Sequence, residues 1–260
     1  MITITNDKIT GFKPRWASFR GFSLLFDNPG VNVAMEQNLF RLNCCVDTDP
    51  ELRLYKAFEE ALKAIGRDIM LNTYLLCLLP SYSYHVTTWD GVNDSNIDQL
   101  NRDKDLFSKF LDELPECMLE KVDFIDLIQE SALISDRDWS LLLKFHKLEK
   151  WNNKALVATL QTFDDKSNQV LEWIKANRAR LSRIFGDKYG IDLSSNFPYV
   201  PHVTLGYYAN DEHAELSTPS IDLWNSIFLK YTKNLQIEFT SISIYAFSNM
   251  VTSFRKSDEK

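Results

Sequence analysis

The tripeptide His-Val-Thr occurs twice in this chain of 260 residues, at positions 85–87 and again at 202–204. The chain has four histidines, so half of them stand in the same short motif. If Thr makes up roughly one residue in twenty, two of four histidines followed by Thr at the second position arise by chance on the order of a per cent of the time. The repetition therefore indicates two related halves that each supply one copy of the motif.

Both copies lie in segments with the composition of β-strands. Because alternate side chains of a strand share a face, His85 and Thr87 are expected to project together, and so are His202 and Thr204. The valine between them then packs into the core. If the halves pack about a pseudo-twofold axis, two imidazoles and two hydroxyls converge on one cleft.

The remaining pattern mixes strands and helices without a linker rich in Gly, Pro or Ser. We predict an α+β chain with a bilobal, pseudo-twofold fold, in which two antiparallel β-sheets flanked by helices surround a central cleft. All of residues 1–260 are expected to form this one bilobal domain. The boundary between the halves is placed near residue 119, with the last strands returning to one of them.

Period-two and period-3.6 patterns, with turn signals between them, set the expected elements. Strands are predicted over 17–26, 39–46, 72–79, 82–89, 122–127, 141–145, 155–160, 201–208, 238–247 and 251–254. Helices are predicted over 50–65, 106–114, 165–185 and 223–231. Asp90-Gly91 is interpreted as a turn.

The charge balance narrows the classes of partner. There are 29 Lys and Arg against 36 Asp and Glu, which gives a net charge of −7. Duplex nucleic acid requires many basic side chains against phosphates, so we expect no duplex DNA partner. A small local anion pocket is still compatible with this balance.

No apolar run approaches the length of a membrane span, and the N-terminal residues lack the pattern of a signal peptide. We therefore expect a cytoplasmic protein without a membrane partner, and a monomer. The spacing of the four cysteines, Cys44, Cys45, Cys77 and Cys117, matches no zinc motif. Reduced thiols are expected, with Cys77 buried as a small apolar residue.

Paired imidazoles and hydroxyls suit one chemistry well. An imidazole titrates near neutral pH, so one copy can accept a proton while the other donates one. Threonine hydroxyls can donate hydrogen bonds to the non-bridging oxygens of a phosphoryl group. In-line attack at phosphorus needs a base on one side and an acid on the other, with no metal and no cofactor required. The chain has no phosphate loop, dinucleotide-binding glycine motif, nucleophile elbow or His-Glu-x-x-His motif.

The two motifs resemble those of the two-histidine (2H) phosphoesterase superfamily, which includes LigT-like RNA ligases and cyclic phosphodiesterases. Residues 80–91 (PSYSYHVTTWDG) are similar to the first motif of one branch of these proteins, and residues 198–207 (PYVPHVTLGY) look like the second. The resemblance implies a bilobal α+β fold with His85 and His202 as catalytic residues. It also implies that Thr87 and Thr204 hold the phosphate.

Aromatic side chains beside the motifs are candidates for stacking on a base. Strand alternation places Trp89 on the face of His85 and Thr87, and Tyr84 and Tyr207 on the opposite face, so Trp89 is preferred.

Tyr199 is a further candidate for binding substrate. Arg20, which interrupts an apolar strand, is a weaker candidate for reaching a phosphate. For each of these aromatic residues, packing in the core is nevertheless the favoured interpretation.

Other polar groups are interpreted as surface. His146 and His213 lie among charged residues. The basic face of the 165–185 helix is expected to be a solvated face or, alternatively, to contact an RNA backbone; it carries Lys175, Arg178, Arg180 and Arg183.

The sequence thus favours a metal-independent phosphodiesterase that hydrolyses a cyclic-phosphate or 2′-5′ phosphodiester bond in nucleotides or short single-stranded RNA. The motifs do not assign which histidine is the acid and which the base. Two alternatives stay open: a nucleotide- or RNA-binding module that uses the same cleft without turnover, and an interaction protein whose matched motifs are a relic of duplication.

Overall fold

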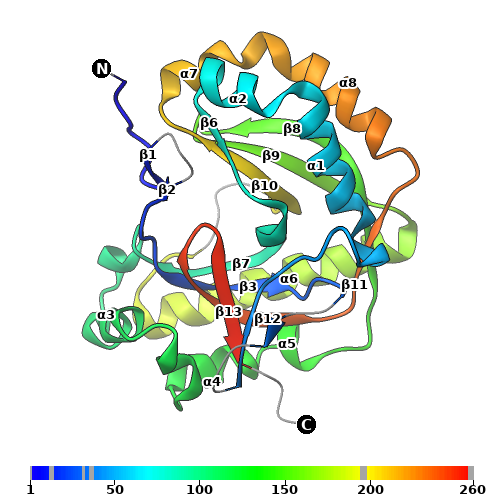
Figure 1. The fold of residues 1–260 in the computed structure, drawn as a ribbon. Helices are drawn as coiled ribbons and strands as arrows, with labels where there is room; N and C mark the ends of the chain where they lie inside the picture. The colour runs from blue at the N-terminus through cyan, green and yellow to red at the C-terminus, as the bar shows by residue number, and fades with distance from the viewer. Residues whose placement is uncertain (1, 12–14, 31–32, 35–37, 194–197, 257–260) are drawn as a thin grey trace.

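The computed structural model describes residues 2–11, 15–30, 33–34, 38–193 and 198–256. Two antiparallel sheets face each other, and the helices lie on their outer sides (Figure 1). This arrangement confirms the predicted α+β class with two antiparallel sheets.

The lower lobe, as oriented in Figure 1, is built on a six-stranded sheet. Its strand order is β4 (Val33–Ala34), β5 (Leu39–Arg41), β13 (Thr252–Lys256), β12 (Ile242–Asn249), β3 (Gly21–Phe26) and β7 (Thr87–Asn93). The upper lobe is built on a five-stranded sheet, in the order β11 (Ile237–Phe239), β8 (Leu141–Trp151), β9 (Ala155–Thr162), β10 (His202–Tyr208) and β6 (Leu76–Leu78). A separate hairpin pairs β1 (Ile9–Gly11) with β2 (Arg15–Trp16).

The helices divide between the lobes. Those on the upper lobe are α1 (Arg53–Ile65), α2 (Arg67–Tyr74), α7 (Asp211–Leu216) and α8 (Ile221–Tyr231). Those on the lower lobe are α3 (Lys104–Asp112), α4 (Asp123–Gln129) and α5 (Ala132–Ser135). Helix α6 (Asp165–Tyr189) contacts both sheets, through β8 and β9 of the upper one and β7 of the lower one. Short 3-10 turns lie at Pro50–Leu52, Ser81–Ser83, Ile97–Gln99, Glu116–Leu119 and Thr218–Ser220. Within the described parts of the chain, no helix is both long enough and apolar enough to cross a bilayer.

Helix α1 shows how local pattern and packing agree. Tyr55, Phe58 and Leu62 follow at helical spacing and are fully buried against the upper sheet and α8. The helix ends at Gly66, whose φ of 104° lies in the region that glycine favours. Its predicted end is confirmed, whereas the predicted first turn, Pro50–Leu52, is a 3-10 turn that precedes the α-helix.

Several predictions of local structure are wrong. The segment 238–247 is not one strand, because it divides into β11 of the upper sheet and β12 of the lower sheet. The strand predicted over 82–89 begins only at Thr87, and Ser81–Ser83 forms a 3-10 turn.

Residues 122–127 form the start of α4 instead of a strand, because Phe124 and Ile128 are buried one helical turn apart. Residues 72–74 still belong to α2, so the strand there is confined to β6. Gly91 lies inside β7 and makes no turn: a Cβ at this position would stand 2.2 Å from the carbonyl oxygen of Phe22 on β3. The glycine allows two backbones to approach closely.

The boundary between the halves near residue 119 is also wrong. Strand β6 belongs to the upper sheet, whereas β7, the next strand in sequence, belongs to the lower one. The last two strands, β12 and β13, lie in the middle of the lower sheet. Neither lobe is therefore a continuous stretch of chain.

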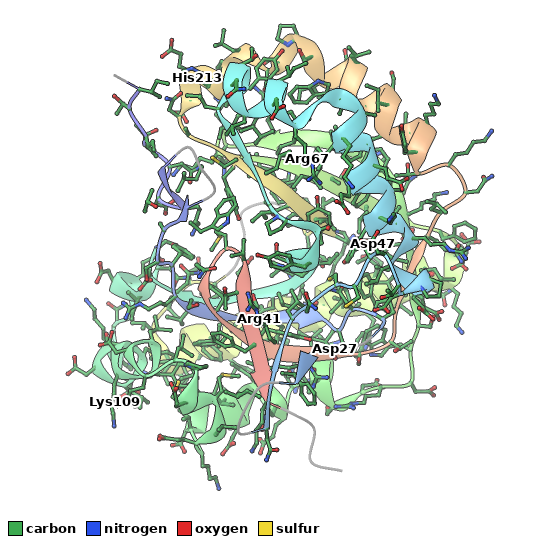
Figure 2. The ribbon with its side chains drawn as sticks, in the orientation of Figure 1. Asp27, Arg41, Asp47, Arg67, Lys109 and His213 are labelled. Atoms are coloured by element: carbon green, nitrogen blue, oxygen red, sulfur yellow. The ribbon has the colours of Figure 1, made fainter. Side chains whose placement is uncertain are left out.

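The end of β3 is tied to β12 by the carboxylate of Asp27, which is labelled in Figure 2. Asp27 accepts hydrogen bonds from Ser241 and Ser243 at 2.8 Å each and from Tyr245 at 2.9 Å. Three hydroxyl donors on one carboxylate fix the register of these central strands, because a slip would leave a half-buried charge without partners.

The two sheets meet at the repeated motifs. Val86 forms an isolated antiparallel bridge with Val203, which links the strand entering β7 to β10. Both valines are fully buried in the main core. The middle residues of the two motifs are thus direct neighbours in space.

A β-bulge follows each motif by one residue. In the lower sheet Leu25 pairs with Thr87 but Leu24 pairs with Trp89, which leaves Thr88 as the extra residue. In the upper sheet the pairing of β10 with β9 skips Leu205 in the same way. A bulge shifts the alternation of side chains by one position, so the faces beyond each motif are reversed.

Gly206, just after the second bulge, is expected to be essential for packing β10 against β6. An added Cβ would stand 2.6 Å from the carbonyl oxygen of Cys77 and 3.0 Å from the Cα of Leu78. Gly206→Ala should lower the free energy of unfolding by about 1–3 kcal/mol, measured by urea denaturation.

The matched control is Gly186→Ala in α6, where the nearest atom, the carbonyl oxygen of Ile191, is 3.5 Å from the added Cβ. This change should leave stability equal or raise it by up to about 1 kcal/mol. A Gly206→Ala protein as stable as the wild type would contradict the close approach.

Candidate active site

The bridge between Val86 and Val203 arranges the four polar side chains of the motifs. In an antiparallel pair, His85 lies opposite Thr204 and Thr87 lies opposite His202. Residues on either side of a paired position project to the other face, so these four side chains share the face opposite the two valines. All four are half-buried, whereas both valines are inaccessible to solvent.

The two histidines occupy diagonal corners of this arrangement. Diagonal neighbours across an antiparallel pair have backbone separations of about 7–8 Å, so both imidazoles are near enough for one small ligand to contact them together. Their charges also act on each other, because a charge on His85 lowers the pKa of His202. The structure therefore brings His85, Thr87, His202 and Thr204 together at one place between the lobes.

Both imidazoles are oriented by the same local hydrogen bond. Nδ1 of His85 lies 2.8 Å from the carbonyl oxygen of Ser83, and Nδ1 of His202 lies 3.0 Å from that of Val200. A carbonyl oxygen only accepts, so each Nδ1 carries the hydrogen and donates it. Nε2 of each ring is then the nitrogen left to exchange protons with a ligand.

Burial disfavours the charged form of both rings. Desolvation is the main cause that lowers the pKa of His85 below its ordinary value of 6.5, and the Ser83 carbonyl partly opposes it. Desolvation also dominates the lowered pKa of His202; the Val200 carbonyl and the Asp90 carboxylate oppose it. Both imidazoles are consequently neutral in the free protein at pH 7.

A cavity of about 530 Å³ adjoins the half of the site formed by Thr87 and His202. This volume is in the usual range for sites that hold a small molecule. Its other lining residues come from β7, the end of β8 and the turn after it, α6 and the segment before β10. They are Asp90, Glu149, Lys150, Trp151, Asn152, Arg178, Pro198, Tyr199 and Val200.

Trp89, the preferred candidate for stacking on a base, is placed differently by the structure. Trp89 is 1% exposed, donates its indole hydrogen to Ser182 at 2.9 Å and packs against Phe185. The bulge at Thr88 explains this, because it turns Trp89 away from the face of the motif. Trp89 therefore belongs to the core, as does Tyr84, which is 1% exposed.

Tyr207 changes faces in the opposite sense. Beyond the bulge at Leu205, Tyr207 lies beside Thr204. Burial raises the pKa of Tyr207 to about 12, and a hydrogen bond with the Thr204 hydroxyl partly opposes this rise. Simple alternation assigned it to the other face.

Arg20 does not line the cavity. Its guanidinium pairs with Asp94 at 3.0 Å and also with Asp112. Both carboxylates lie far from Arg20 in the sequence, so the sequence alone does not show that they neutralise the charge of Arg20.

Tyr199 is the predicted residue that does line the cavity, and its hydroxyl donates to the carbonyl oxygen of Thr87 at 2.9 Å. Trp151, at the end of β8, was missed by the sequence reasoning. Its ring centroid is 4.1 Å from that of His202, so it packs directly on a motif imidazole. The only sequence signal was the Asn152-Asn153 pair after it, which marks a hairpin turn.

The two remaining histidines lie elsewhere. His146 is exposed on β8. His213 is on α7, at the top of the upper lobe in Figure 2, where its Nδ1 is 2.8 Å from the side-chain oxygen of Asn210. Among the residues that the structure describes, no group of three His, Cys, Asp or Glu side chains is arranged to hold a metal ion.

The fold is shared with a conserved protein of unknown function from Agrobacterium tumefaciens str. C58. That structure aligns with 95% of this chain and 88% of its own at 10% sequence identity, with a TM-score of 0.54. Usb1 from Kluyveromyces marxianus aligns with 92% of this chain and 98% of its own at 11% identity, with a TM-score of 0.43. E. coli LigT, solved in complex with 3′-AMP, aligns with 92% of this chain and 95% of its own at 10% identity, with a TM-score of 0.41. Models of known protein families and curated protein sequences give no match.

We predict that His85 and His202 titrate below pH 6.5 in the free protein, because both lose hydration on folding. NMR titration of the imidazole signals, assigned with His85→Ala and His202→Ala, measures both values. Long-range 15N shifts at pH 8 should show hydrogen on Nδ1 in both rings. A midpoint above 6.5 for either ring, or hydrogen on Nε2, would contradict the geometry described above.

Proposed function

We propose that this protein is a metal-independent phosphodiesterase that works by two-histidine general acid/base catalysis. Its proposed substrates are nucleotides or short single-stranded RNA with a cyclic phosphate or a 2′-5′ phosphodiester bond. The observation that carries the proposal is the antiparallel bridge between Val86 and Val203, which presents two imidazoles and two hydroxyls on one face.

The proposed reaction uses the free Nε2 atoms. One neutral imidazole takes a proton from water or a ribose hydroxyl as its oxygen attacks phosphorus. The other imidazole, in its charged form, gives a proton to the oxygen whose bond to phosphorus breaks. The Thr87 and Thr204 hydroxyls donate hydrogen bonds to the non-bridging oxygens, where negative charge gathers.

The lowered pKa values fit this cycle once a ligand is present. A phosphodiester carries a negative charge, and an anion between the rings favours the imidazolium form. Binding of the substrate would therefore place a proton on one of two rings that are neutral without it. The two lobes each supply half of the site, which supports treating residues 1–260 as one functional unit.

The net charge of −7 supports small or short substrates over long nucleic acid, since extended phosphate backbones require many basic contacts. The aromatic rings of Trp151 and Tyr199 beside the site are suited to contact a nucleoside.

Replacing either histidine is expected to abolish most hydrolysis. His85→Ala and His202→Ala should each lower kcat by about 10²–10⁴-fold, because each removes one proton-transfer step. Product formation from a panel of 2′,3′-cyclic, 3′,5′-cyclic and 2′-5′-linked nucleotides is the measurement. His146→Ala, an exposed histidine on β8, is the matched control and should keep full activity.

Two outcomes would overturn the enzymatic proposal. Near-wild-type turnover in either histidine variant would exclude the mechanism. Tight stoichiometric binding of a phosphorylated nucleotide, with no product from any member of the panel, would instead identify a binding module.

Activity should survive incubation with EDTA, because the proposed chemistry uses only protein side chains for proton transfer and charge stabilisation. Initial rates before and after chelation and desalting are compared. A loss of activity that added divalent cation restores would refute the metal-independent mechanism.

A further inference from the structure

Arg178 differs from the other basic residues of α6. Lys175 pairs with Glu172 at 2.7 Å on the surface, and Arg180 and Arg183 are exposed. Arg178 is instead half-buried, and it lines the cavity beside Thr87 and His202. The structure therefore separates one guanidinium from a face that the sequence treats as uniform.

The guanidinium of Arg178 is fixed by the strand that carries the first motif. Its Nε donates to the carbonyl oxygen of Thr88, the bulged residue. Its guanidinium carbon lies over the ring of Tyr199, 4.1 Å from the centroid, and the Tyr199 hydroxyl donates to the Thr87 carbonyl. These contacts hold the fork in place before any ligand arrives, which lowers the entropic cost of binding one.

Within the described residues, no carboxylate forms an ion pair with Arg178, and Asp90 acts on it only through its charge at longer range. The two Nη groups have no hydrogen-bond partner there, and Arg178 forms no salt bridge. Glu149, which lines the same cavity, is occupied by Lys147 at 2.7 Å and by the Trp151 indole at 3.1 Å. Asp90 also lines the cavity but is not bonded to Arg178.

Burial of this cation is costly and lowers the pKa of Arg178, and the interactions with Tyr199 and Asp90 only partly oppose the shift. An anion that enters the cavity would remove this cost. A planar fork with free Nη groups is the side chain best suited to a phosphate, which it can contact with two parallel hydrogen bonds.

We propose that Arg178 forms a second phosphate subsite, next to the scissile phosphate on the side of Thr87 and His202. The ligand is a nucleotide with a further phosphate group: a terminal 5′-phosphate or the next phosphodiester of an oligonucleotide. This inference rests on the proposed function, because it assumes that the first phosphate lies between the two motifs.

The test is calorimetric binding of matched ligand pairs to the full-length protein. Nucleoside 3′-monophosphates are compared with the corresponding 3′,5′-bisphosphates for all four bases, and the tightest pair is used. We expect the bisphosphate to bind the wild type at least 10-fold more tightly. Arg178→Gln should reduce this ratio to near one and leave the affinity for the monophosphate unchanged.

Two further variants test whether the preference for the bisphosphate depends on the position of the charge and on the guanidinium group. Arg183→Gln removes the same charge from an exposed position of α6 and should keep the wild-type ratio. Arg178→Lys retains a charge without the fork and should give an intermediate ratio. A dinucleotide with an internal phosphate, compared with the 5′-phosphorylated mononucleotide, identifies which of the two phosphates the subsite prefers.

The inference is overturned if Arg178→Gln weakens both members of the pair equally, since Arg178 would then only support β7. It is also overturned if no bisphosphate binds, or if the wild type shows no preference. Hydrolysis that depends on His85 and His202 without a bisphosphate preference would reject the subsite alone. A preference that depends on Arg178, in a protein without turnover, would retain the subsite and reject the catalysis.

Discussion

The backbone pairing of Val86 with Val203 is the contact on which the candidate site depends. Among the described residues it joins two sheets whose named strands do not pair with each other, and it does so between the middle residues of the two motifs. An antiparallel pair has a local two-fold axis, so the symmetry of the site follows from one backbone contact. The burial of both valines gives the contact its stability, because separation of the lobes would expose them to water.

Each motif is surrounded by the same two devices. A carbonyl two residues before the histidine orients its ring, and a bulge one residue after the threonine reverses the strand. The carbonyls leave Nε2 as the reactive nitrogen of each ring. The bulges allow the next part of each strand to follow its own sheet while the motif faces the other lobe. The segments around the two motifs thus orient the imidazole and redirect the strand by the same means.

The sequence was sufficient for the four central side chains because strand alternation is reliable over three residues. Beyond the bulges the same rule failed, and it placed both Trp89 and Tyr207 on the wrong face. The contacts of Arg20 and Trp151 could not be predicted from the sequence for another reason. Arg20 pairs with Asp94 and Asp112, and Trp151 packs on His202, and in each case the partner is distant in the chain. The short apolar run at 122–127 fits a strand or a helix equally well, and tertiary packing selects the helix.

The strand order of the lower sheet has a consequence for synthesis on the ribosome. Strands β3 and β5 are made early, yet they are not neighbours; β12 and β13 lie between them. This sheet cannot close until residue 256 has left the exit tunnel, whereas β6, β8, β9 and β10 of the other sheet are complete by residue 208. The nascent chain can pair β3 with β7 and β5 with β4, but the edges of β3 and β5 that face β12 and β13 stay unpaired until the last strands are made. These two edges are open to wrong pairing during that interval.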